Sequence, residues 1–184
     1  MGKNNQVCPV ERAGFLDSRI RRFFHNPRKI LVPYIRQGMT VLDLGCGPGV
    51  FTLEIGKMVG ESGKVIAADL QEGMLQIVLK KIRQTELEKR IELHQCQEDK
   101  IGFQGKVDFV LAFYMLHEVP NQEKVLREIR SILNPGGKLF IVEPKFHVSQ
   151  QAFEDTLDIA RKVGLKVVQQ TRNFLSLEAV LERD

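Results

Sequence analysis

The chain of 184 residues is long enough to bury a hydrophobic core without disulfide bonds or a structural metal. Its composition, 43% hydrophobic and 27% charged, is that of a globular protein, and no apolar run reaches the roughly 18 residues of a membrane-spanning helix. The three cysteines share no C-x-x-C spacing, so the sequence predicts reduced thiols rather than a zinc site. The net charge of +4 is uneven, because residues 1–36 carry eight basic and two acidic residues.

The N-terminal segment predicts helices and carries the basic charge. It lacks the apolar stretch of a signal peptide, so we expect a cytoplasmic protein. Two short amphipathic helices are predicted, the first with Phe23 and Phe24 and the second from Asn26-Pro27 through Tyr34-Ile35. We interpret residues 1–37 as a lid whose Phe23, Phe24 and Tyr34 turn toward a substrate. A solvated face without a role, and a surface for RNA or a membrane, remain alternatives.

From Gly38 onward, β-branched apolar runs alternate with segments of helical period. Strands are predicted near 39–44, 64–69, 91–96, 106–113 and 137–143, and helices near 49–59, 71–86, 121–133 and 149–163. Two last runs, 165–171 and 174–181, are separated by Arg172-Asn173 and predict an antiparallel edge hairpin. Residues 38–184 are therefore expected to form one α/β domain with a mostly parallel sheet and helices on both faces.

The segment from Val41 to Thr52 joins an apolar strand to a glycine turn and then to a helix. Its glycines Gly45, Gly47 and Gly49 are spaced G-x-G-x-G, whereas dinucleotide folds have G-x-G-x-x-G. The third glycine of the dinucleotide motif is missing, which argues against a nicotinamide-dependent oxidoreductase. Asp43, two residues before the first glycine, favours a cationic ligand.

A second carboxylate, Asp69, ends the predicted strand 64–69. A carboxylate at this position is able to accept hydrogen bonds from two adjacent ribose hydroxyls. The same residue also fits a capping box, Asp69-Leu70-Gln71-Glu72, for the helix that follows. Both roles are compatible if they use different oxygens.

Four features resemble, in order and spacing, the motifs of class I S-adenosylmethionine-dependent methyltransferases. They are VLDLGCGPG at 41–49, Asp69, KVDFVLAFYMLHEV at 106–119 and LNPGGKLFIVEP at 133–144. Over residues 38–184 the chain is most similar to the small-molecule branch that includes ubiquinone/menaquinone C-methyltransferases and arsenite methyltransferases. The resemblance implies a Rossmann-like methyltransferase fold, with five parallel strands plus a hairpin that holds one antiparallel strand. It also implies S-adenosylmethionine as cofactor, S-adenosylhomocysteine as product and a small-molecule acceptor.

The resemblance further implies cofactor-binding roles for residues of several segments: Asp43, Gly45, Cys46, Gly47, Pro48, Gly49, Asp69, Leu70, Met74, Gln97, Glu98, Ala112 and Phe113. The glycine loop and Asp43 would hold the methionine part, and Asp69 would bind the ribose hydroxyls. Leu70 and Met74 would line the adenine pocket. Gln97 stands where the family has an acid for the adenine amine, so either Gln97 or Glu98 would bind that amine.

The residues that follow the predicted strand 106–113 are the candidates for chemistry. Methyl transfer is a displacement at an activated sulfonium, so the protein mainly orients the acceptor and excludes water. The resemblance implies that His117 and Glu118 lie where substrate-facing residues fall in this fold, and Tyr114 is predicted to contact the substrate as well. His117 is either a base for an acceptor that loses a proton or a loop residue that ties down backbone. No metal site is predicted, because Asn121 stands where H-E-x-x-H needs a histidine.

The leading hypothesis is therefore a methyltransferase that acts on a small molecule. An RNA methyltransferase that uses the basic N-terminal segment, and a non-catalytic S-adenosylmethionine-binding protein, are the alternatives. A nucleic-acid amine methyltransferase would be expected to show an (Asp/Asn)-Pro-Pro-(Tyr/Phe) turn, but residues 112–117 read AFYMLH.

Overall fold

The computed structural model describes residues 26–184, which divide after Cys96 into two compact units. All seven strands belong to a seven-stranded sheet, to which the first unit contributes the order β3-β2-β1 and the second the order β4-β5-β7-β6. Phe23 and Phe24 lie outside the described residues. The division into a lid at 1–37 and a domain at 38–184 therefore stays a prediction.

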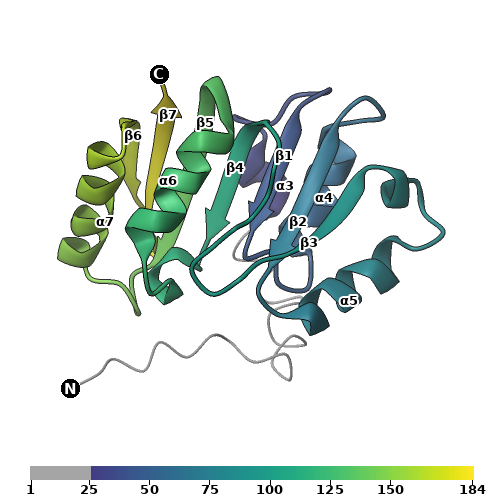
Figure 1. The fold of residues 1–184 in the computed structure, drawn as a ribbon, viewed down its shortest axis with the longest axis horizontal. Coiled ribbons are helices and arrows are strands. Elements are labelled where there is room, and N and C mark those ends of the chain that lie inside the picture. Colours follow the sequence, from purple (N-terminus) through teal and green to yellow (C-terminus); the bar gives the residue numbers. More distant parts are fainter. Residues whose placement is uncertain (1–25) are drawn as a thin grey trace. The chain divides into compact units, whose positions relative to one another are not determined.

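The first unit alternates helices and strands. Its elements are α3 (Pro27–Leu31), β1 (Thr40–Leu44), α4 (Val50–Met58), β2 (Lys64–Asp69), α5 (Glu72–Ile82), the 3-10 turn η2 (Glu86–Lys89) and β3 (Ile91–Gln95). The pairs β1–β2 and β2–β3 are both parallel, so these three strands lie side by side (Figure 1). The predicted strands of this region are confirmed.

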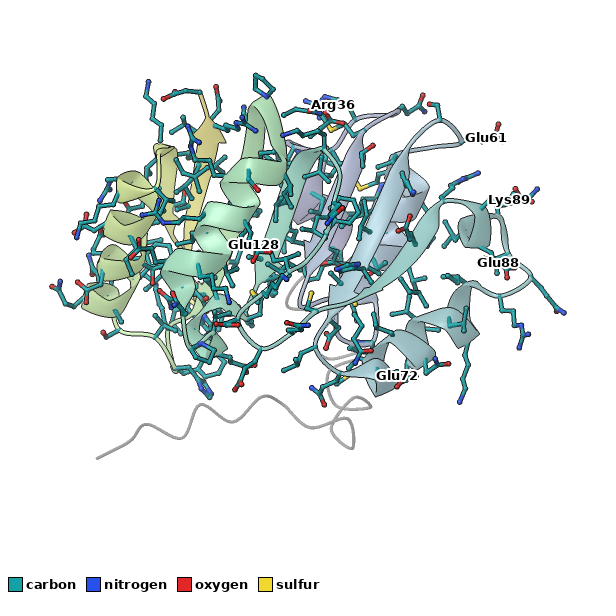
Figure 2. The ribbon with its side chains drawn as sticks, viewed as in Figure 1. Arg36, Glu61, Glu72, Glu88, Lys89 and Glu128 are labelled. Atoms are coloured by element: carbon teal, nitrogen blue, oxygen red, sulfur yellow. The ribbon has the colours of Figure 1, made fainter. Side chains whose placement is uncertain are left out.

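Burial explains why the strands of this unit are continuously apolar. Residues 65–68 of β2 are all fully buried, as expected for a parallel strand that is covered on both faces. Helix α5 places its apolar side chains at helical spacing, with Met74, Leu75 and Val78 buried. Glu72, in the first turn of α5 (Figure 2), carries a negative charge where the helix dipole favours one.

Helix α3 is shorter than the helix predicted from Asn26-Pro27. Asn26 caps it as expected, because the side-chain oxygen accepts a hydrogen bond from the Lys29 amide at 3.2 Å. The helix ends at Leu31 and does not continue to Ile35, since Pro33 has no N–H with which to extend the hydrogen-bond ladder.

The second unit begins with β4 (Val107–Phe113). The elements that follow are the 3-10 turn η3 (Leu116–Glu118), α6 (Gln122–Ile132), β5 (Leu133–Pro144), α7 (Gln150–Lys162), β6 (Leu165–Arg172) and β7 (Ser176–Arg183). Strand β5 pairs parallel with β4 and antiparallel with β7, and β7 pairs antiparallel with β6. The strand β7 is thus the antiparallel member of the C-terminal hairpin, which confirms the predicted fold class.

Two connections differ from the prediction. The hairpin turn contains three residues, 173–175, because Asn173 accepts hydrogen bonds from the Leu175 and Ser176 amides and delays the start of β7. Strand β5 already begins at Leu133, where it pairs with Val107, and it then bulges through residues 134–137. After β3, Gln97 and Lys100 form an isolated antiparallel bridge.

Candidate active site

Every glycine of the loop after β1 has a positive φ, which explains the alternating spacing. The φ angles are 71° at Gly45, 52° at Gly47 and 85° at Gly49, in the region that only glycine adopts without strain. The Gly45 and Cys46 amides donate to the Ala68 carbonyl at 2.8 and 3.0 Å, which ties the loop to the end of β2.

The last two glycines of the loop have different surroundings. A Cβ added at Gly49 would lie 2.9 Å from Cγ2 of Val78, so close packing against α5 requires glycine there. A Cβ added at Gly47 would meet no atom within 4 Å. Gly47 therefore borders open space, which is the room that a ligand needs to approach the loop backbone.

Asp43 is a buried carboxylate near the end of β1, with 2% of its surface exposed. Burial raises its pKa to about 7 despite the hydroxyl of Thr52, which donates to Oδ2 at 2.6 Å. The nearby charge of Asp69 adds to the increase. No cationic side chain of the described residues forms an ion pair with Asp43.

Asp69 holds backbone with both of its oxygens. Oδ2 accepts from the Gly47 amide at 2.8 Å, and Oδ1 accepts from the Gln71 amide at 2.9 Å. Burial raises its pKa, and these backbone hydrogen bonds oppose that effect. The predicted capping box is wrong, because Gln71 is the N-cap of α5 and its side chain makes no capping bond. The Leu70 backbone also contributes a hydrogen bond to Asp69, and a carboxylate has about four acceptor sites, so acceptor capacity for a hydroxyl group is left.

The remaining predicted residues of the first unit support the loop or border it. Cys46 is buried, and burial raises the pKa of its thiol, so it is a packing residue and no nucleophile. The Pro48 carbonyl accepts from Nζ of Lys81 at 2.7 Å, which fastens the loop to α5. Met74 is buried and Leu70 is half-buried.

The other predicted cofactor residues belong to the second unit. Gln97 and Glu98 are exposed, and Gln97 forms an isolated bridge with Lys100. Ala112 and Phe113 are buried at the end of β4. The structure thus describes their positions, and their roles toward a cofactor stay predictions.

Tyr114, directly after β4, has a strained backbone. Its φ of 58° is unfavourable for a bulky side chain and costs on the order of 1–2 kcal/mol. The amide of Tyr114 donates to the Val142 carbonyl of β5 at 2.8 Å, and its ring lies 4.4 Å from that of Phe113. Such strain persists only where the surrounding structure holds it, and it is common at binding sites.

A buried carboxylate that the sequence reasoning missed contacts His117. Glu143, near the end of β5, accepts from the His117 amide at 3.0 Å and lies 2.5 Å from its ring Nδ1. Burial lowers the pKa of His117, but the hydrogen bond and charge of Glu143, with the charge of Glu118, outweigh it and raise the pKa overall. The signal was present, since Glu143 ends an apolar strand run as Asp69 does.

A row of ring contacts leads away from His117 within the second unit. The ring of His147 lies 5.9 Å from that of His117, and Phe146 contacts both His147 at 4.9 Å and Tyr114 at 6.5 Å. Phe146 is 73% exposed. The predicted substrate residue Tyr114 is therefore part of an aromatic cluster that also includes Phe146 and His147. Tyr34, in the first unit, is half-buried.

The open α/β sheet, with its glycine turn and strand-end carboxylates, has the architecture of class I methyltransferases. Residues 35–175 match a family described as "Methyltransferase domain". The chain belongs to this family, which confirms the resemblance found in the sequence.

Curated relatives agree with the small-molecule branch. The chain is 39% identical over 121 residues to "Demethylmenaquinone methyltransferase" of Lactococcus lactis, an alignment that covers 64% of this chain and 48% of the relative. It is 32% identical over 145 residues to "Ubiquinone/menaquinone biosynthesis C-methyltransferase UbiE" of Salmonella arizonae, with coverages of 76% and 58%. The chain thus spans about half the length of these relatives.

Solved structures match almost the whole chain. A "SAM dependent methyltransferase from Aquifex aeolicus" has a TM-score of 0.86 and 27% identity, and the match covers 97% of this chain and 100% of that one. A "putative s-adenosyl-l-methionine-dependent methyltransferase" from Methanococcus maripaludis has a TM-score of 0.79, 19% identity and coverages of 100% and 97%, and it supports the fold alone. Among the described helices, none is long and apolar enough to cross a membrane.

Proposed function

We propose that the chain is an S-adenosylmethionine-dependent methyltransferase for a small-molecule acceptor. The observation that carries the proposal is the environment of Asp43. Its carboxylate is buried with a pKa raised to about 7, and within residues 26–184 no cationic side chain is paired with it. A cationic ligand would supply the missing positive charge. S-adenosylmethionine, when bound, provides an ammonium and a sulfonium that carries the activated methyl group.

The residues of the glycine loop fit such a ligand. The open space at Gly47 admits a ligand close to backbone amides, while Gly49 keeps the loop packed on α5. In our proposal Asp43 and residues 45–49 bind the methionine part. Asp69 binds the ribose hydroxyls with the acceptor capacity that its backbone partners leave available.

The adenine and acceptor assignments complete the proposal. Leu70 and Met74 provide apolar surface for adenine, and Gln97 or Glu98 accepts from its amine. Ala112 and Phe113 border the methionine end. His117, Glu118 and Tyr114 face the acceptor, and we retain residues 1–37 as the lid. Because the relatives include a demethylmenaquinone methyltransferase and a ubiquinone/menaquinone C-methyltransferase, demethylated quinones are the first acceptors to test.

A binding comparison tests the cofactor. Isothermal titration calorimetry on the full chain with S-adenosylmethionine, S-adenosylhomocysteine and NAD is expected to give binding of the first two and none of NAD. Preference for NAD would overturn the proposal. For a variant that neutralises Asp43, the matched control is Asp158→Asn, which removes the negative charge of an exposed carboxylate of α7.

A transfer assay tests the acceptor class. The full chain is incubated with methyl-labelled S-adenosylmethionine and either demethylmenaquinol or fractionated cell extract, and the label is followed. Label in a small molecule is the expected result. Label in RNA would favour the nucleic-acid alternative, and cofactor binding without any transfer would favour a non-catalytic binding protein.

A further inference from the structure

Glu143 contacts both the backbone and the ring of His117. One carboxylate oxygen accepts from the His117 backbone amide at 3.0 Å, and the other lies 2.5 Å from the ring nitrogen Nδ1. A carboxylate that binds both backbone and ring fixes the position of the turn η3 and the rotation of the imidazole together. The ring cannot turn without losing the shorter of the two bonds.

The burial of the two side chains differs. The side chain of Glu143 is 3% exposed, whereas that of His117 is 23% exposed. The carboxylate is thus removed from water while the imidazole reaches the surface. A buried carboxylate that holds a partly exposed imidazole is the arrangement that orients a histidine base.

The contact also selects the tautomer of the ring. A carboxylate oxygen only accepts, so Nδ1 carries the proton and the lone pair of the neutral ring lies on Nε2. Within the described chain, Nε2 of His117 has no hydrogen-bond partner. Three titratable groups face the ring: Glu143 from β5, Glu118 from η3 and His147 from the segment after β5.

The cluster of Tyr114, Phe146 and His147 provides an apolar surface next to this base. Phe146 is 73% exposed and contacts the rings of both Tyr114 and His147. Exposed aromatic surface of this kind binds the apolar body of a ligand. No group of three His, Cys, Asp or Glu side chains able to hold a metal ion occurs within residues 26–184.

We propose that Glu143 is the positioning residue of a His117–Glu143 pair in which Nε2 of His117 removes a proton from the acceptor. This proposal rests on the proposed methyltransferase function and deepens it. It assigns the acceptor to compounds that lose a proton on methylation, such as those with a hydroxyl or amine, or with a carbon–hydrogen bond made acidic by its neighbours. Acceptors without such a proton, for example thioethers and tertiary amines, do not need this pair.

The step balances in atoms and charge. The bond between the acceptor atom and its proton breaks, and the proton goes to Nε2 of His117. The electron pair left on the acceptor atom forms the bond to the methyl carbon. The pair of the sulfur–methyl bond returns to sulfur, so one positive charge leaves the methyl donor and one appears on His117. Glu143 stabilises that imidazolium through Nδ1, and water later removes the proton.

The pair can be tested without an acceptor. In ¹⁵N NMR spectra of the full chain, neutral His117 is expected to be the Nδ1–H tautomer and to titrate above pH 6.5. In Glu143→Gln the pKa of His117 should fall by about one unit or more, since that change removes a contacting charge. Glu118→Gln should lower it less, because Glu118 acts on the ring through its charge alone. An Nε2–H tautomer, or an unchanged pKa in Glu143→Gln, would overturn the proposal.

Kinetics separate positioning from a structural role. With the acceptor that becomes labelled, His117→Ala should lose on the order of 100-fold or more in kcat while its affinity for S-adenosylmethionine stays unchanged. Glu143→Gln should lose about tenfold or more in kcat with little change in KM, and its rising pH limb should move to lower pH. Glu143→Asp, which keeps the charge, should recover part of the rate. If Glu143→Asp and Glu143→Gln are equally impaired and neither pH limb moves, the pair is structural.

The two proposals fail separately. If S-adenosylmethionine does not bind, the proposed function is rejected. The NMR result then still tests whether Glu143 sets the tautomer and pKa of His117. Binding and transfer with a pH profile that does not depend on Glu143 would keep the function and reject the pair.

Discussion

Two carboxylates in different units are equally buried and have different partners. Asp43 of β1 and Glu143 of β5 each expose 2% of their surface. Asp43 accepts from the Thr52 hydroxyl, a neutral donor, whereas Glu143 contacts the imidazole of His117. The first lacks a basic side-chain partner within the described chain, whereas the second contacts an imidazole that becomes cationic when it is protonated.

This difference indicates what each region is built to do. A buried carboxylate without a cation is costly to ionise, which is why the pKa of Asp43 rises to about 7. The site gains most from a ligand that brings positive charge. Glu143 instead contacts the imidazole of His117, and its hydrogen bond and charge raise the pKa of that side chain. In our proposals, Asp43 binds the ligand and Glu143 orients a proton acceptor.

The largest expected effect comes from Asp43→Asn. The variant keeps the shape of the side chain and removes the negative charge, so affinity for S-adenosylmethionine should fall about 100-fold, as expected when a buried charge-assisted contact is lost. Calorimetry measures the affinity, and thermal unfolding checks that the fold is kept. Asp158→Asn should bind as the wild type does. Equal affinity in Asp43→Asn would remove the contrast between the two carboxylates.

Two glycine substitutions separate packing from ligand space in the first unit. Gly49→Ala should destabilise the fold by about 2–3 kcal/mol, because it combines a φ of 85° with a 2.9 Å contact to Val78. Gly47→Ala should cost about 1 kcal/mol from backbone strain alone, yet it should lose most cofactor affinity by filling the open space. Denaturant unfolding and calorimetry measure the two quantities. A Gly47→Ala protein that binds normally would show that the ligand does not approach this loop.

A smaller effect on binding is expected for Asp69→Ala. The substitution removes the acceptor of the Gly47 and Gln71 amides, so it should lower stability by about 1–3 kcal/mol as well as weakening binding about tenfold. Measuring affinity at a temperature where the variant is fully folded separates the two effects. Unchanged affinity under those conditions would reject the ribose assignment while leaving the role in the loop intact.

An effect of similar size is expected for the pH dependence of cofactor binding. Below pH 7 the ligand-free protein holds a proton on Asp43 that a cationic ligand must displace, so affinity should rise about tenfold from pH 6 to pH 8. Asp43→Asn should bind with little pH dependence. Calorimetry in buffers of different ionisation enthalpy should detect proton release in the wild type alone. A flat profile in the wild type would mean that Asp43 does not face the cation.

The pH dependence of stability distinguishes the two regions as well. The folded pKa of Asp43 exceeds the unfolded value of 3.8, so its contribution to stability is lost as pH rises from about 4 to 7. The folded pKa of His117 exceeds 6.5, so the stability that Glu143 gives is complete below that value and is lost at higher pH. Urea unfolding between pH 4 and 9 measures both losses of stability. The loss between about pH 4 and 7 should disappear in Asp43→Asn, and the loss above pH 6.5 should disappear in Glu143→Gln.

Local rules made the glycine loop predictable. Alternating glycines adopt positive φ angles wherever the backbone needs them. An apolar run with Asp43 near its end, or Asp69 at its end, already implies a buried strand with a carboxylate there. The same rules misplaced Asp69 as a capping residue. A capping box and a bond to the Gln71 amide need the same residue type at the same position, and only the contacts in the folded chain separate them.

The sequence by itself determined the order of strands and helices, the glycine turn, the antiparallel hairpin and the family, because each depends on residues that are near one another in the chain. The tertiary structure decided which distant side chains meet. Glu143 lies 26 residues after His117, and no sequence pattern links the two positions. They meet because β4 and β5 pair in parallel and the turn η3 follows β4. Pairing between strands is a long-range event, so a contact such as His117–Glu143 is visible only once the sheet has formed.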